Sequence, residues 1–195
     1  MDPVALKKAR SRLRVARKAV EDLATCKDYD NFTDVWYIFL TASKNVYTVL
    51  EQGAKGSPQS RQWFGTKKQE RRGDALLQYI YQARNDDEHG LLPVAESVSG
   101  NLRIGVSKPG YSTSTVINST PNGGFHVASM DGRPVLVEQT FPHIRLMQVR
   151  DRGGKLYDPP EKHMGSKIPS NMPLPVAELT TAYLEAMIGE AEALA

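Results

Sequence analysis

The sequence predicts an α+β protein in which an N-terminal antiparallel helical bundle is followed by a small antiparallel β meander or sandwich. A C-terminal helix is expected to pack back on the bundle. Apolar residues recur at helical spacing over residues 1–90 and again over 173–195. Residues 91–172 are instead rich in Gly, Pro, Ser and β-branched residues, which is typical of short strands and turns. We therefore expect three regions with these boundaries.

The chain begins with a long predicted helix. Its apolar positions recur at alternating steps of three and four, which is the seam of a bundle helix: Leu6, Ala9, Leu13, Ala16, Val20 and Leu23. A second helix is predicted over 32–52, capped by Asp30 or Asn31 and ended by Gly53. Tyr37 and Ile38 widen the apolar surface of this helix, so we expect it to lie between other helices or at a dimer contact.

A third helix is predicted to start at Pro58, because Ser57 can cap it and proline suits the first turn. Gly65 and Gly73 are sites of expected interruption. Helical spacing then continues to His89, and Gly90 is well placed just beyond the helix end.

The composition of residues 91–172 predicts several short strands. The Asp131-Gly132 pair predicts a hairpin between two of them. The expected strands cover residues 102–106, 113–118, 125–130, 134–140 and 144–150. A proline-rich linker follows. The last segment has one apolar face that a single helix cannot bury alone, so it should join the bundle as its fourth helix or bridge the bundle and the sheet.

Composition limits the chemistry. A single cysteine, Cys26, excludes an internal disulfide framework and any zinc site built from several thiolates. No apolar run is long enough to span a bilayer, and the N-terminus lacks the apolar core of a signal peptide. We therefore expect a cytoplasmic protein that does not associate with membranes.

Positive charge is concentrated in the first half of the chain. Residues 1–18 hold seven bases against Asp2 alone, and a second basic cluster lies in the third predicted helix. Such clusters attract a phosphate backbone, although a charge run alone is more often a solvated helix face. The candidate nucleic-acid-binding residues are Lys7, Lys8, Arg10, Arg14, Arg17, Lys67, Lys68, Arg71 and Arg72.

The most informative stretch is the end of the helix that closes the first 90 residues. Arg84 is followed at once by Asn85 and, after three further positions, by His89. A guanidinium matches phosphate oxygens, and an imidazole transfers protons near neutral pH. Residues five apart on an ideal helix point about 140° away from each other. The two side chains can therefore meet on one ligand only if the helix unwinds near His89.

This Arg-polar-x-x-x-His pattern resembles the signature of the HEPN ribonuclease family, whose members are helical bundles. The resemblance covers residues 1–90, with 176–195 as a candidate closing helix, and leaves the β region unassigned. It implies RNA cleavage without a metal or cofactor, in which the substrate's 2′-hydroxyl attacks and a cyclic phosphate remains. Arg84 would bind the scissile phosphate, Asn85 would orient the histidine or a phosphate oxygen, and His89 would move protons.

The resemblance also implies a composite site formed by two motif copies across a homodimer. A role as a toxin or defence component is expected, with a possible protein partner such as an antitoxin.

Two alternatives stand beside this hypothesis. Arg84 could simply pair with Glu88 one helical turn later, while His89 caps a helix end. The chain could also be a non-catalytic module that binds RNA or a protein. A metal site at Asp86, Asp87 and Glu88 is disfavoured, because consecutive helical residues point in different directions. The spacing of His126, His143 and His163 suggests no metal site either.

Overall fold

A computed structural model describes residues 1–106, 114–120, 125–132 and 134–195. The chain divides into two compact units. The helical unit comprises Met1–Glu96 and Ile144–Ala195, and the hairpin unit comprises Ser97–His143. The β region predicted over 91–172 is thus shared between the two units.

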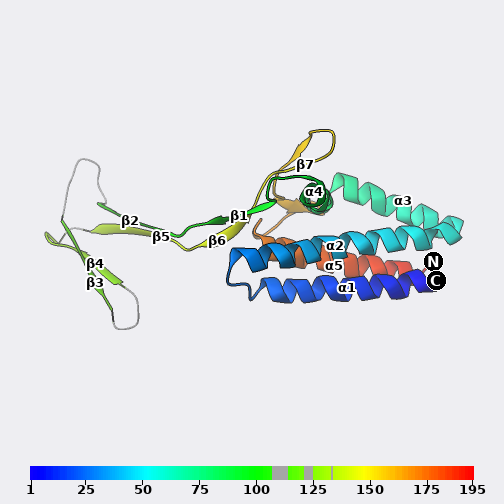
Figure 1. Cartoon of the computed structure of the whole chain (residues 1–195), viewed down its shortest axis with the longest axis horizontal. Helices are drawn as coiled ribbons and strands as arrows, with labels where there is room; N and C mark the ends of the chain where they lie inside the picture. Colours follow the sequence, from blue (N-terminus) through cyan, green and yellow to red (C-terminus); the bar gives the residue numbers. More distant parts are fainter. Residues whose placement is uncertain (107–113, 121–124, 133) are drawn as a thin grey trace. The chain divides into compact units, whose positions relative to one another are not determined.

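Five α-helices form the described part of the helical unit (Figure 1). They are α1 (Pro3–Leu23), α2 (Tyr29–Gly53), α3 (Pro58–Gly73), α4 (Ala75–His89) and α5 (Pro173–Glu192), with a 3₁₀ turn, η1, at Ala54–Gly56. The side chains of Asp2, Asp28, Ser57 and Asp74 cap the first four by accepting backbone N–H groups.

Two details of the helix prediction are wrong. The second helix starts at Tyr29 and is capped by Asp28, not by Asp30 or Asn31, because the Asp28 carboxylate accepts the Asn31 N–H at 2.8 Å. The third helix also passes through Gly65 without a break and ends at Gly73, where the chain turns into α4.

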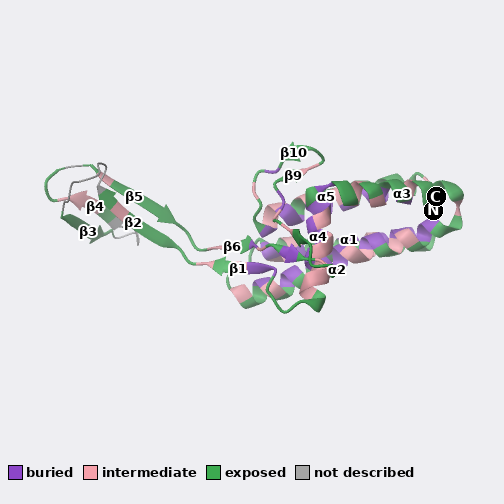
Figure 2. Cartoon of the chain, turned by 90° about the horizontal axis from the view of Figure 1, so that it is seen from above, coloured by how far each residue is buried: buried purple, intermediate pink, exposed green. Residues whose placement is uncertain are grey.

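The core lies where α1, α2 and α5 meet along their lengths, and α5 contacts α4 as well. Large side chains from separate helices are fully buried there, among them Leu13, Trp36, Phe39 and Leu184. Figure 2 shows buried residues, in purple, along the helices of this unit. The C-terminal helix therefore packs back on the N-terminal helices, as predicted. It makes a five-helix rather than a four-helix arrangement.

Short strands support α4 from the side. Strand β1 (Ala95–Val98) pairs with β6 (His143–Leu146), β7 (Val149–Arg150) with β8 (Leu156–Tyr157), and β9 (Lys162–His163) with β10 (Ser166–Lys167). The single strand predicted over 144–150 is wrong, since β6 and β7 are separate and pair with different partners. The buried Tyr79 of α4 donates its hydroxyl to the carbonyl of Met147, between those strands, at 2.7 Å.

The β9–β10 hairpin holds the N-terminal end of α4. The Asp74 carboxylate, which caps α4, also accepts the Met164 N–H at 2.6 Å and lies 3.0 Å from His163 Nδ1. Both ends of α4 are therefore fixed by residues far away in the sequence.

The hairpin unit contains two antiparallel pairs in its described residues. Strand β2 (Asn101–Val106) pairs with β5 (Val135–Thr140), and β3 (Thr115–Ser119) pairs with β4 (Phe125–Ser129). The predicted hairpin across Asp131-Gly132 is wrong, because the strands on its two sides are paired with β3 and β2 rather than with each other. Residue 113, the predicted start of one strand, lies outside the described residues.

Candidate nucleic-acid interface and Arg–His motif

The motif lies on the last turns of α4. Leu76, Tyr79, Ile80 and Ala83 are buried, so the inner face of α4 is fixed in the core. The helix continues through His89, and the N–H of Gly90 bonds to the carbonyl of Asp86. The spacing of the motif predicts that the helix unwinds near His89. This prediction is wrong, because α4 stays helical through His89.

The Glu88 carboxylate is paired with Arg84 and lies near His89. Arg84 Nη2 donates to Glu88 Oε1 at 2.7 Å, and Arg84 Nη1 forms an ion pair with Glu88 Oε2. His89 Nε2 lies 3.5 Å from Glu88 Oε2. The side chain of Arg84 is only 17% exposed, whereas that of His89 is 48% exposed. The Arg84–Glu88 pair is also what the purely structural alternative predicts, so this pair alone does not decide between the two.

Asn85 faces a different neighbour. Its Oδ1 accepts a hydrogen bond from Lys44 Nζ of α2 at 2.9 Å, and its Nδ2 donates to Gln82 at 3.4 Å. Within one chain, Asn85 bonds to neither Arg84 nor His89. It connects the motif to α2 instead of orienting the imidazole.

A cation that the sequence did not single out reaches His89 from the β7–β8 loop. Arg152 Nη2 lies 3.1 Å from His89 Nε2, an arrangement in which Nε2 accepts if the imidazole proton is on Nδ1. The loop is held against α4, because Asp86 Oδ2 accepts the N–H of Arg150 at 2.8 Å. Arg152 is 63 residues from His89, and in the sequence it only marks a turn.

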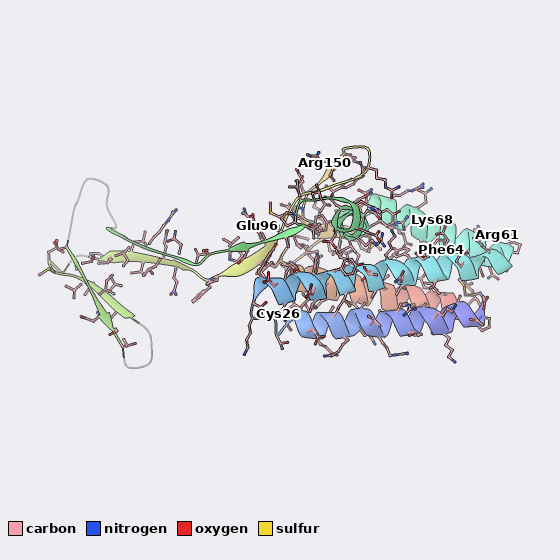
Figure 3. The ribbon with its side chains drawn as sticks, viewed as in Figure 1. Cys26, Arg61, Phe64, Lys68, Glu96 and Arg150 are labelled. Carbon is pink, nitrogen blue, oxygen red and sulfur yellow. The ribbon has the colours of Figure 1, made fainter. Side chains whose placement is uncertain are left out.

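Beside the motif, helices α2, α3 and α4 enclose a hollow of 310 Å³ that we call the basic groove. It is lined by Lys44, Tyr47, Thr48, Glu51, Lys68, Arg71, Arg72 and Tyr81. Three of these, Lys68, Arg71 and Arg72, belong to the second predicted basic cluster. Lys68 projects from α3 near Phe64 (Figure 3) and is paired with Glu51.

Lys44 is the least expected member of the basic groove. Its position in α2 is flanked by the buried Ser43 and Val46. Burial lowers the pKa of Lys44, and the positive charge of Arg84 lowers it further, with smaller contributions from Arg152 and Arg71. Three cations from three other segments of the chain therefore act on Lys44.

The remaining predicted cations have other surroundings. Lys67 is buried and forms ion pairs with Glu70 and Glu190, which makes it part of the α3–α5 interface and removes it from the basic groove. On α1, Arg10 pairs with Glu192 and Arg17 with Glu185 of α5. Lys7, Lys8 and Arg14 are exposed.

Comparisons with protein-family models, with curated proteins and with solved structures found no match for this chain.

Two further properties concern only the described residues. Within them, no helix is both long and apolar enough to cross a membrane. No group of three or more His, Cys, Asp or Glu side chains in the same ranges is arranged to hold a metal ion.

Proposed function

We propose that this chain is a metal-independent endoribonuclease of the HEPN type, with Arg84 and His89 acting on one phosphodiester. The observation that carries the proposal is the shared carboxylate: Glu88 is in contact with the guanidinium and lies 3.5 Å from the imidazole. A carboxylate presents two oxygens with partial negative charge, as a phosphodiester does. Two side chains that reach one carboxylate can also reach one phosphate once Glu88 rotates away.

The chemistry requires only groups present in the RNA and in the motif. The 2′-oxygen attacks the adjacent phosphorus and loses its proton, while the bond from phosphorus to the 5′-oxygen breaks and that oxygen gains a proton. The products are a 2′,3′-cyclic phosphate and a free 5′-hydroxyl. His89 acts in proton transfer, because its ring is exposed at the helix end. Arg84 stabilises the charge that builds up on the non-bridging oxygens.

The proposal includes a homodimer in the cytoplasm, in which two motif copies complete each site. Tyr37 and Ile38 of α2 support this, since their exposed fractions of 47% and 46% leave apolar surface for a second copy. A toxin or defence role, with a neutralising protein partner, belongs to the same proposal.

One observation favours the second candidate, a non-catalytic RNA-binding module. Glu88 neutralises Arg84 in the isolated chain, whereas Lys44 and Arg71 have no carboxylate within 4 Å among the residues the structure describes. In that case the basic groove would bind RNA and the motif would stabilise the end of α4.

Cleavage of single-stranded RNA by the purified protein in EDTA tests the proposal. We expect fragments that end in a 2′,3′-cyclic phosphate, and a loss of about 100-fold or more in rate for His89→Ala. His143→Ala is the matched control, since the ring of that partly buried histidine bonds only to the Phe141 carbonyl among the described residues. Equal rates for His89→Ala and the wild type would refute the catalytic assignment. Binding without cleavage would favour the second candidate.

A further inference from the structure

The basic groove has cations without counter-ions. Lys44 Nζ has one hydrogen-bond partner in the described chain, the amide oxygen of Asn85. The side chain of Arg71 has no hydrogen bond and no ion pair among the described residues, and its guanidinium lies over two aromatic rings instead. Partial burial of a cation costs free energy when no anion lies nearby. Lys44 and Arg71 face the hollow without such an anion, so this arrangement points to a bound one.

Arg71 is held in a defined orientation. Its guanidinium carbon is 4.1 Å from the ring centroid of Tyr81 and 5.2 Å from that of Tyr47. Stacking of this kind fixes the plane of the guanidinium and leaves its N–H edges free for a bidentate contact with phosphate oxygens. Lys44 lies over the Tyr81 ring too, at 5.7 Å. One tyrosine thus positions both cations.

The other two cations that line the basic groove, Lys68 and Arg72, differ from Lys44 and Arg71. Lys68 is neutralised by Glu51, and Arg72 is exposed at the end of α3. The central cations are therefore Lys44 and Arg71. The volume of 310 Å³ is close to the lower limit of about 300 Å³ for small-ligand sites, which suits one phosphate with part of its nucleotide rather than a large cofactor.

The basic groove is also joined to the motif. The Lys44–Asn85 hydrogen bond connects its central lysine to the residue next to Arg84. We infer that Lys44 and Arg71, with Tyr81 between them, form a subsite for a second backbone phosphate of the RNA strand, next to the phosphate held by Arg84 and His89. The inference rests on the proposed function for its substrate class, but not on cleavage itself.

The test measures binding of a short, fluorescein-labelled oligouridylate carrying 2′-O-methyl groups, which cannot be cleaved by its own 2′-oxygen. We expect Lys44→Gln and Arg71→Gln each to weaken binding about tenfold. Each should also reduce the magnitude of the slope of log K against log salt concentration by about 0.7. Lys27→Gln is the matched control, because this exposed residue lies outside both basic clusters, forms no ion pair in the described chain and loses the same charge.

Binding by both groove variants within twofold of the control would overturn the subsite. Arg71→Lys separates charge from stacking, and far-ultraviolet circular dichroism verifies that each variant is folded. Since the probe cannot be cleaved, weaker binding by Lys44→Gln supports the subsite even if His89→Ala shows that the protein is no nuclease.

Uridine monophosphate and inorganic phosphate serve as competitors. We compare the concentrations at which each competitor and the unlabelled oligonucleotide displace the probe. If uridine monophosphate or inorganic phosphate competes as well as the oligonucleotide does, the subsite binds a small phosphorylated ligand and not an RNA strand.

Discussion

At the residue scale, Glu88 occupies the place where the proposed phosphate would bind. Its carboxylate occupies the guanidinium of Arg84 and lies beside His89, so a phosphate must compete with it. Exposed i,i+4 ion pairs on helices contribute about 0.3–0.5 kcal/mol to stability, and Glu88, the partner that must move, is 34% exposed. A cost of this size is small compared with charge-assisted bonds to phosphate, and a substrate can displace the carboxylate.

Replacing Glu88 should therefore increase affinity for RNA. We expect Glu88→Gln to bind the uncleavable oligouridylate about fivefold more tightly, equivalent to about 1 kcal/mol, because Arg84 becomes free and a negative charge is lost. Fluorescence anisotropy at fixed salt measures the effect. Glu21→Gln on α1 is the control for net charge. If the two variants gain equally, Glu88 has no specific relation to a phosphate site.

Gly53 marks a second residue at which small changes matter. A β-carbon added there would lie 2.3 Å from the Ala5 Cβ, whereas one added at Gly56 would meet nothing within 4 Å. The ends of α1 and α2 approach each other too closely for a side chain. We expect Gly53→Ala to lower the free energy of unfolding by about 1–3 kcal/mol in urea denaturation. Gly56→Ala should leave it within about 0.5 kcal/mol, and equal effects of the two would show that the approach is looser.

At the element scale, the sequence predicted helices better than strands. Helix spacing and a cap such as Ser57 are local signals, so the existence of the helices and several of their ends could be read from the chain. Strand pairing is non-local. Nothing near Asp131 and Gly132 in the sequence shows that β4 returns to β3 and β5 to β2.

The candidate site shows the same difference between local and non-local signals. Arg84, Asn85 and His89 could be found because they share one helix. Lys44 and Arg152 could not, because only packing brings α2 and the β7–β8 loop to the end of α4. Lys67 resembled its basic neighbours in the sequence, yet it is buried in the interface with α5, since helix periodicity turns adjacent residues to different faces.

That interface provides a prediction for pH. Burial tends to raise the pKa of Glu190, but hydrogen bonds from Lys67 and Trp63 outweigh it and lower the pKa below the model-compound value of 4.5. Because the folded-state pKa lies below the unfolded one, the stabilisation is fully present above pH 4.5 and is lost as the pH falls through the folded-state value.

We therefore expect Glu190→Gln to cost about 1 kcal/mol or less at neutral pH, since the side chain is half exposed and solvent screens the pair. The difference from the wild type should shrink as the pH falls below 4.5. Urea denaturation across this range measures it. A difference that is constant with pH would show that the carboxylate charge contributes nothing to the α3–α5 interface.

At the scale of the whole molecule, the two units differ in how they are stabilised. No residue of the two hydrophobic core clusters in the described chain comes from 97–143. In the hairpin unit, large apolar side chains such as Ile117, Leu136 and Phe141 are more than half exposed. The helical unit therefore contains the described core and the candidate site.

Replacement of 97–143 by a short Asn-Gly turn should leave the helical unit folded. We expect a cooperative thermal transition with a Tm within about 5 °C of the full chain, and unchanged affinity for the uncleavable RNA. Circular dichroism at 222 nm follows the transition. Loss of the cooperative transition would show that the hairpin unit contributes to the core, and loss of binding alone would place part of the RNA interface in that unit.

Nuclear magnetic resonance of the histidine rings tests most directly whether Arg84 and His89 bind one phosphodiester together. On addition of the uncleavable oligouridylate, the imidazole signal of His89 should shift, while those of His126 and His143 serve as internal references. The shift should disappear in Arg84→Ala at RNA concentrations that still saturate the basic groove. A His89 signal that stays in place while the RNA binds, or one that moves equally without Arg84, would contradict the account.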